Sequence, residues 1–297
     1  MKIRFDQAAP YEVDEADAPF ARPAGQELLA RIYRPKGEPE APLAALVDVH
    51  GGAWSRGDHL TGALHGRALA ATGLVVVSVG FRQGPAAKHP AASADVAAGV
   101  RYVRAHARRL GVDPRRVGIV GSSSGGQLAL LAALKPGAPE LAGTPIVTQD
   151  GSVDAAPGDE TVAFVLALYP VADPLARFRY VLGRQNDGSG FDAGRLVAAH
   201  HGYFLSEAQM AEASVTRIVT AREARVLPPV WLAHPGLDDN VPAEITDAFV
   251  QAYQQAGGAI ERVHFPGARH GFIGQPSTDT DKAISMMRDF IGRQLSR

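Results

Sequence analysis

One short stretch constrains this chain more than any other. An apolar, β-branched run leads at once into Gly121-Ser122-Ser123-Ser124-Gly125 and then into a second apolar run. The first run, residues 117–120, is typical of a buried strand, and the second is typical of a helix. A strand that turns into a helix through Gly-x-Ser-x-Gly holds its central serine in a strained conformation above the sheet. The stretch therefore predicts an exposed Ser123 hydroxyl at the positively polarised start of a helix.

The motif alone is a weak signal, because a chain with 32 glycines can contain a Gly/Ser-rich turn by chance. The surrounding pattern supports the stronger interpretation. We expect strands at residues 11–13, 27–34, 43–49, 74–79, 117–120, 162–169, 230–234 and 260–265, and helices at 61–71, 90–110, directly after Ser123, 242–255 and 279–295. Strands that alternate with helices predict an α/β protein with a mainly parallel sheet, whose functional residues gather at the carboxyl ends of the strands.

Two segments break this alternation. Residues 135–160 are rich in glycine and proline without clear periodicity, so we expect an extended loop near the site. Residues from about 173 to 226 contain a polar loop and predicted helices at 192–199 and 206–213, and we expect them to form a lid-like insertion over the sheet. Because no charged or low-complexity linker divides the chain, we predict that residues 1–297 form a single domain.

The composition excludes several classes of function. A hydrophobic fraction of 46% and a charged fraction of 21% are those of an ordinary globular protein with an ample core. A net charge of −1 gives no reason to expect nucleic acid or a membrane as a partner. The absence of cysteine excludes disulfides, thiolate metal sites and a cysteine nucleophile. The amino terminus lacks the apolar core of a signal peptide, so we predict a cytoplasmic protein.

A serine hydroxyl becomes a good nucleophile only when a base takes its proton. Among 10 histidines, His270 is best placed for this role because it lies just beyond the last predicted strand. Such a histidine needs a carboxylate that fixes its tautomer, and Asp238 and Asp239 both follow the strand at 230–234. Either could instead cap the next helix. We assign Asp238 to the histidine and keep Asp239 as the alternative.

The oxyanion of a tetrahedral intermediate needs N–H groups that already point toward it. The segment His50-Gly51-Gly52-Ala53-Trp54 directly follows a predicted strand and has a backbone with little side chain in its way. The N–H groups of Gly52 and Ala53, with that of Ser124 after the nucleophile, are therefore the predicted oxyanion hole. His50 is expected to hold this loop by a hydrogen bond rather than to act as a second base.

These motifs together resemble the α/β-hydrolase superfamily. His-Gly-Gly-Ala-Trp, Gly-Ser-Ser-Ser-Gly-Gly, Gly-Leu-Asp-Asp-Asn-Val-Pro and His-Gly-Phe are similar to those of its esterase/lipase group, which includes relatives of hormone-sensitive lipase and kynurenine formamidase. The resemblance covers the chain from about Glu27 to its end. It implies an α/β-hydrolase fold and the hydrolysis of carboxylic esters, or sometimes amides, through an acyl-enzyme formed by Ser123, His270 and Asp238, without a metal or another cofactor.

The sequence gives less information about the substrate pocket. Trp54 stands beside the predicted oxyanion loop, and Tyr169 ends the predicted strand that comes after the serine helix. Phe81 follows another predicted strand and Phe204 lies in the insertion, so we expect these four aromatic side chains to contact substrate. His200-His201 resembles a metal-binding pair, but adjacent residues do not share a helix face, and we expect no metal there.

The favoured hypothesis is a carboxylesterase that uses a Ser-His-Asp triad on small to medium acyl groups. An amidase, arylformamidase or peptidase could use the same triad, and a non-catalytic small-molecule-binding protein could share the fold. The expected partner is a small-molecule ester, and a homodimer is compatible with the sequence. Neither the physiological substrate nor the oligomeric state follows from these residues.

Overall fold

The structure is a computed structural model that describes residues 2–296. Its centre is a ten-stranded sheet in the order β12-β11-β10-β7-β5-β6-β3-β2-β8-β9, and a short pair, β1 and β4, lies apart from it. The strands are β1 (Lys2–Ile3), β2 (Val13–Ala21), β3 (Leu28–Pro35), β4 (Glu38–Pro39), β5 (Leu43–Val49), β6 (Val75–Val79), β7 (Val112–Ser122), β8 (Ile146–Val147), β9 (Val153–Asp154), β10 (Val165–Leu168), β11 (Val230–Pro235) and β12 (Ile260–Phe265).

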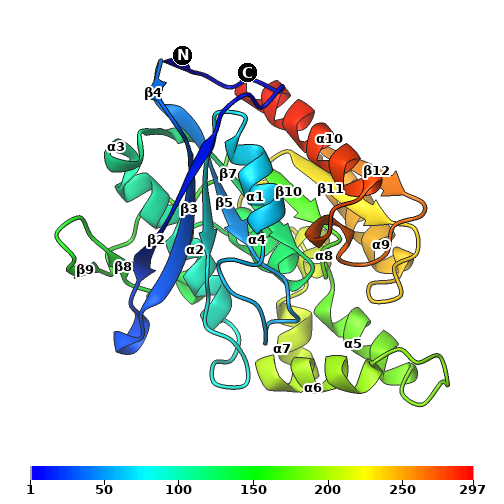
Figure 1. The fold of residues 1–297 in the computed structure, drawn as a ribbon. Helices are drawn as coiled ribbons and strands as arrows, with labels where there is room; N and C mark the ends of the chain where they lie inside the picture. Colours follow the sequence, from blue (N-terminus) through cyan, green and yellow to red (C-terminus); the bar gives the residue numbers. More distant parts are fainter. Residues whose placement is uncertain (1, 297) are drawn as a thin grey trace.

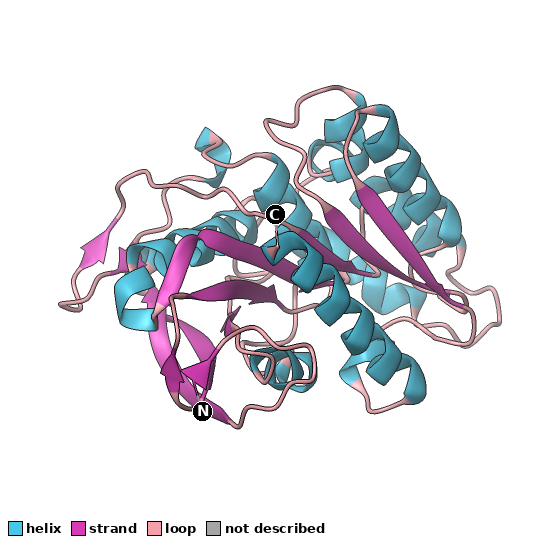
Figure 2. Cartoon of the chain, turned by 90° about the horizontal axis from the view of Figure 1, so that it is seen from above, coloured by secondary structure: helices cyan, strands magenta, loops and turns pink. Residues whose placement is uncertain are grey.

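All pairings from β12 through to β6 are parallel, whereas β3, β2, β8 and β9 add antiparallel strands at the other end. The sheet is strongly twisted, as the view from above shows (Figure 2). This arrangement confirms the predicted α/β class with a mainly parallel sheet. It also sets the carboxyl ends of β5, β7, β10, β11 and β12 side by side at one edge, where residues from distant parts of the chain can meet.

Helices cover both faces of the sheet (Figure 1). The helices are α1 (Ala63–Ala70), α2 (Ala91–Ala105), α3 (Ala107–Leu110), α4 (Ser124–Leu134), α5 (Pro174–Gly183), α6 (Ala193–Tyr203), α7 (Glu207–Glu212), α8 (Val215–Thr220), α9 (Ala243–Gln255) and α10 (Thr278–Leu295), with short 3-10 turns η1 (Pro23–Gly25), η2 (Pro139–Leu141) and η3 (Phe272–Gly274). No helix within residues 2–296 is both long enough and apolar enough to cross a membrane.

The core divides into two layers because successive strand residues face opposite sides of the sheet. On β5, Val47 and Val49 belong to the buried cluster that includes apolar residues of α2, α4 and α9, whereas Leu46 belongs to the cluster that includes those of α1 and α10. The central strands are buried on both sides and therefore consist almost entirely of apolar and β-branched residues. This double burial is why the sequence predicted these strands well.

Helices α5 to α8 form the insertion that follows β10, at the carboxyl edge of the sheet (Figure 1). The sequence predicted two helices in this insertion, and the structure has four. The first of the missed helices, α5, had a recognisable start: the Asp173 side chain accepts a hydrogen bond from the Ala176 N–H, and Pro174 occupies the first turn. The buried positions of α5, at 174, 177, 178 and 181, have helical spacing, but position 177 is an arginine, so the apolar residues alone do not show the pattern.

Residues 135–160 are largely irregular, as expected, but they do not lie near the predicted site. They carry the short strands β8 and β9, and β8 pairs with β2 at the antiparallel end of the sheet. This end lies on the opposite side of the sheet order from β11 and β12. The predicted position was wrong because the segment is held by strands of only two residues, which give no periodicity by which their pairing could be recognised.

Candidate active site

Ser123 lies at a sharp turn between β7, which ends at Ser122, and α4, which begins at Ser124. Its backbone has φ 54° and ψ −119°, a conformation that L-residues rarely adopt. Gly125 makes the turn possible, because a Cβ atom at that position would lie 2.2 Å from the backbone oxygen of His50. The glycine therefore lets the loop after β5 approach Ser123, so the motif allows the ends of β5 and β7 to lie in close contact.

Three side chains from different strand ends form one hydrogen-bonded chain. The His270 Nδ1 lies 2.8 Å from Asp238 Oδ2, and its Nε2 lies 2.8 Å from Ser123 Oγ. Because a carboxylate only accepts hydrogen bonds, Nδ1 carries the proton and donates it to Asp238. The neutral ring then presents its lone pair at Nε2, where the serine hydroxyl donates. This tautomer lets His270 take the proton of Ser123.

The loop after β11 contains both candidate carboxylates, Asp238 and Asp239, and places them differently. The other carboxylate oxygen of Asp238 accepts hydrogen bonds from the N–H groups of Asn240 and Val241 at 2.9 and 2.8 Å, and its side chain is only 4% exposed. Asp239 is exposed to solvent. Of the two candidates, Asp238 is thus the one that contacts His270, and its backbone hydrogen bonds fix the orientation of the carboxylate.

The loop after β5 passes beside Ser123 and lines the same cavity. Gly52 has φ 121°, and a Cβ atom there would lie 2.0 Å from the backbone oxygen of Arg56, so only glycine fits. The following Ala53 also has a positive φ, 53°. The Trp54 N–H donates to Ser124 Oγ at 3.2 Å, which ties the loop to the start of α4. As the first residue of α4, Ser124 has no acceptor for its N–H within the helix.

His50 hydrogen-bonds within its own loop, as expected. Its Nδ1 donates to the backbone oxygen of Gly51 at 2.8 Å, and its ring stacks on Phe81 with centroids 4.1 Å apart. Burial lowers the pKa of His50, which keeps the ring neutral. His50 therefore holds the loop through its hydrogen bond to Gly51 and its stacking on Phe81.

Three of the four aromatic residues expected at the substrate lie elsewhere. Phe81 packs on His50, while Trp54 and Phe204 are almost fully buried and pack on each other edge to face. Positive φ at Trp54, 57°, turns its side chain into the core, where its Nε1–H donates to Gln127 Oε1 at 3.0 Å. Sequence proximity to the site was thus misleading, since it does not give the direction of a side chain.

The fourth aromatic residue, Tyr169, does line the cavity. It follows β10, and its ring meets His270 edge to face with centroids 4.9 Å apart. Burial raises the pKa of its phenol, so Tyr169 stays protonated at neutral pH. The cavity beside Ser123 and His270 has a volume of about 480 Å³. It is large enough for a small molecule but has few large apolar side chains in its wall.

The remaining wall of the cavity is polar in ways that the sequence analysis did not predict. His65 of α1 lies in it and hydrogen-bonds through Nε2 to Asp48 of β5 at 3.0 Å, while the Ser78 hydroxyl donates to the other oxygen of Asp48 at 2.6 Å. Burial alone would raise the pKa of Asp48, but these partners lower it, so the carboxylate remains charged. Three arginines, Arg56, Arg177 and Arg195, complete this part of the wall.

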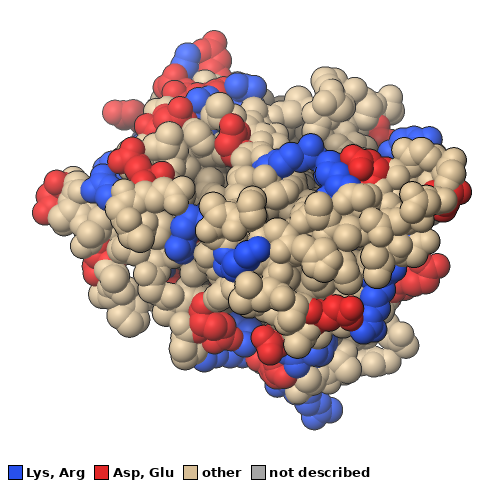
Figure 3. Space-filling model, turned by 90° about the horizontal axis from the view of Figure 1, so that it is seen from below, with Lys and Arg blue, Asp and Glu red and all other residues tan. Residues whose placement is uncertain are grey.

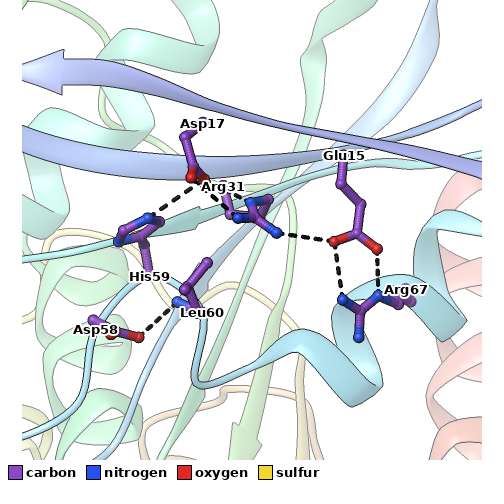
Figure 4. Close-up of polar contacts among 7 residues, drawn as sticks. All are labelled: Glu15, Asp17, Arg31, Asp58, His59, Leu60 and Arg67. Atoms are coloured by element: carbon purple, nitrogen blue, oxygen red, sulfur yellow. Dashed lines mark hydrogen bonds and ion pairs between the residues drawn. The ribbon is translucent and has the colours of Figure 1, made fainter.

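An ion-pair network holds one side of the cavity in place (Figure 4). Arg31 of β3 bridges Asp17 and Glu15 of β2 at 2.6 and 3.0 Å, and Arg67 of α1 also pairs with Glu15. The His59 Nε2 lies 3.4 Å from Asp17 Oδ1. His59 belongs to the loop between two groups of cavity-lining residues, so the network fastens that loop to the sheet.

The protein has the α/β-hydrolase fold. A mainly parallel sheet flanked by helices carries a sharp turn at Ser123 after a central strand and a helical insertion after β10. Comparison with family models gives the family: residues 31–253, about three quarters of the chain, match the BD-FAE family, and the chain belongs to it. The predicted resemblance to the esterase/lipase group of α/β hydrolases is thereby confirmed.

Curated relatives and solved structures agree with this assignment. The chain is 29% identical over 253 residues to "Esterase LipC" of Mycobacterium tuberculosis (82% of this chain, 57% of that protein) and 27% identical over 282 residues to "Ethyl acetate hydrolase" of Pseudomonas putida (91% and 80%). The chain therefore spans less than two thirds of the first relative. A hyperthermophilic esterase of Pyrobaculum calidifontis shares the fold, with a TM-score of 0.76 at 24% identity over 97% of this chain and 86% of that one.

Proposed function

We propose that this protein is a serine carboxylesterase in which Ser123, His270 and Asp238 perform catalysis. The single observation that supports this most is the hydrogen-bonded chain from Ser123 Oγ through His270 to Asp238, with both links at 2.8 Å, beside a cavity. Membership in a family with esterase relatives supports the type of reaction. The names of the relatives alone do not give this chain's substrate.

In the proposed reaction, Ser123 Oγ attacks the ester carbonyl carbon while its proton moves to His270 Nε2. The resulting oxyanion accepts hydrogen bonds from the N–H groups of Gly52, Ala53 and Ser124. When the tetrahedral intermediate collapses, the alkoxide takes the proton from His270 and leaves as the alcohol. His270 then deprotonates a water, which attacks the acyl-enzyme. As the second tetrahedral intermediate collapses, Ser123 Oγ takes this proton back from His270 and the carboxylic acid is released. Asp238 stabilises the imidazolium in both halves.

The cavity supports small to medium acyl groups as substrates. Its described wall contains many glycines and polar residues, and Leu196 and Tyr169 are the large apolar side chains in it. A long alkyl chain would find few large side chains to pack against there. We therefore expect turnover to fall as the acyl chain is lengthened beyond a few carbons. The predicted cytoplasmic location and the possible homodimer remain predictions.

Steady-state hydrolysis of p-nitrophenyl esters, from acetyl to lauroyl, tests this proposal with wild type and Ser123→Ala. We expect wild type to hydrolyse the short esters and the variant to lose at least about ten-thousand-fold in kcat. Ser122→Ala is the matched control, because it removes the neighbouring hydroxyl on the other side of Ser123, which is part of neither the triad nor the oxyanion hole. Turnover that survives in Ser123→Ala would contradict the assignment of the nucleophile.

An amidase, arylformamidase or peptidase could use the same groups, because protonation of the leaving amine by His270 is the only further requirement. A matched anilide in the same panel separates these possibilities. Faster turnover of the anilide than of the ester would favour an amidase. A non-catalytic binding protein is the least favoured alternative, since all three side chains are already oriented for reaction.

A further inference from the structure

Arg177 is an unusual residue to find in the wall of the cavity. It belongs to α5 of the insertion, and only 1% of its surface is exposed. Its Nε and Nη2 donate to the backbone and side-chain oxygens of Asn240, which carry no charge. Its Nη1 has no hydrogen-bond partner within residues 2–296. A buried guanidinium therefore lies at the cavity with unused hydrogen-bonding capacity.

The charges around Arg177 do not neutralise it. No carboxylate within residues 2–296 forms an ion pair with Arg177, and Asp238, whose charge favours the guanidinium, already accepts hydrogen bonds from His270 and two backbone N–H groups. Burial, and then the charge of Arg195, lowers the pKa of Arg177 to about 9, so the guanidinium is still charged at neutral pH. Arg177 and Arg195 thus line the same cavity with like charges, which is unfavourable unless a ligand supplies an anion.

The charged side chains that line the cavity are all positive, whereas the carboxylates of Asp48 and Asp238 lie behind the wall and are already hydrogen-bonded to His65 and His270. The described lining residues include Arg56, Arg177 and Arg195 but no aspartate or glutamate. Arg195 is 37% exposed and has only a solvent-exposed ion pair with Asp192. The outer surface differs, because charged side chains of both signs are spread over the face of the molecule seen from below (Figure 3). The positive charge is therefore a local property of the cavity.

We propose that the esters cleaved at this site carry a carboxylate group, which Arg177 binds and Arg195 helps to bind. The inference rests on the proposed esterase function and adds the chemical class of substrate to it. A planar guanidinium with unused N–H groups matches the planar carboxylate, and charge-assisted hydrogen bonds are the strongest of this type. The carboxylate can belong to the acyl group or to the alcohol, and the test distinguishes the two.

The test measures kcat/KM for two pairs of substrates that differ only in charge. In the first pair the alcohol carries the group: para-acetoxybenzoate against para-acetoxybenzamide. In the second the acyl chain carries it: monomethyl adipate against the methyl ester of adipamic acid. We expect wild type to prefer the carboxylate by about 10-fold to 100-fold in one pair. A ratio of one or less in both pairs, with neutral esters still hydrolysed, overturns the inference but leaves the proposed esterase function intact.

Variants identify the residue responsible for the preference. Arg177→Met should abolish the preference for the carboxylate, and Arg177→Lys should restore part of it. A merely structural role of Arg177, through its contact with Asn240, would lower both rates together and leave the ratio unchanged. Arg179→Met is the matched control, because Arg179 lies on the same helix but is exposed and pairs with Glu207 at 2.9 Å. It should keep the wild-type ratio.

Binding to Ser123→Ala provides a readout that does not require turnover. Calorimetric titration with para-acetoxybenzoate and with para-acetoxybenzamide should show tighter binding of the carboxylate, or the equivalent result with the adipate pair. The same titration in Ser123→Ala combined with Arg177→Met should show equal binding. Equal binding of both members of both pairs to Ser123→Ala would contradict the inference, even if the enzyme proved inactive toward every ester.

Discussion

Replacing Asp238 with asparagine tests the geometry of the site most sensitively. The change keeps the size and shape of the side chain. In the native loop one carboxylate oxygen accepts from the N–H groups of Asn240 and Val241, and the other accepts from His270 Nδ1. An amide has only one oxygen. Because the two backbone N–H groups need an acceptor, that oxygen will face them, and the NH2 group will face His270.

The tautomer of His270 then changes. An NH2 group only donates, so Nδ1 must offer its lone pair and the ring proton moves to Nε2. There the ring can no longer accept the proton of Ser123. The opposite orientation of the amide would leave two backbone N–H groups without an acceptor, at about 1–3 kcal/mol each. We therefore expect kcat to fall about ten-thousand-fold, which corresponds to ~5.5 kcal/mol in the activation barrier.

The assay is hydrolysis of a short p-nitrophenyl ester at neutral pH, with Asp239→Asn as the control. The control makes the same chemical change one residue away, at an exposed side chain, and should keep kcat within about twofold of wild type. Circular dichroism and thermal unfolding would verify that Asp238→Asn is folded. A folded Asp238→Asn that loses less than about tenfold, or an equal loss in Asp239→Asn, would refute the reasoning about the tautomer.

Two further predictions concern stability. Gly125→Ala places a Cβ atom 2.2 Å from the His50 backbone oxygen, so it should lower the free energy of unfolding in urea by about 1–3 kcal/mol or more. Gly202→Ala, with open space around it, is the control and should be neutral. A Gly125→Ala variant as stable as wild type would contradict the packing argument. Burial lowers the pKa of His89 from 6.5 to about 4, so the unfolded state binds more protons between these values and stability should fall by roughly 2 kcal/mol from pH 7 to pH 5. His89→Leu should make this dependence shallower, and an unchanged slope would contradict it.

The sequence predicted those parts of the molecule that local patterns determine. Strand β5 occupies residues 43–49, as predicted, because a buried and almost wholly apolar run of this length has few alternatives in an alternating chain. Strand β12 also occupies the predicted residues 260–265, although most of its side chains are exposed or half-buried. Ser123, Asp238 and His270 could be selected because each directly follows a strand or a recognisable motif. Their hydrogen bonds required only that parallel strands end at one edge of the sheet.

The substrate cavity could not be predicted in the same way. Arg56 comes from a loop, and Arg177 and Arg195 come from two helices of an insertion whose path depends on packing against the rest of the fold. Nothing near Arg177 in the sequence indicates that its guanidinium is buried. Trp54 shows the converse, because a position beside the oxyanion loop suggested a substrate contact while its backbone conformation turns it into the core.

The central claim is that Ser123 is the catalytic nucleophile, and covalent labelling tests it most directly. The protein would be treated with a fluorophosphonate, digested and analysed by mass spectrometry. We predict one phosphonyl adduct, on the peptide that contains Ser123, and no adduct in Ser123→Ala or after heat unfolding. An adduct on another residue, or equal labelling of Ser123→Ala, would contradict the account.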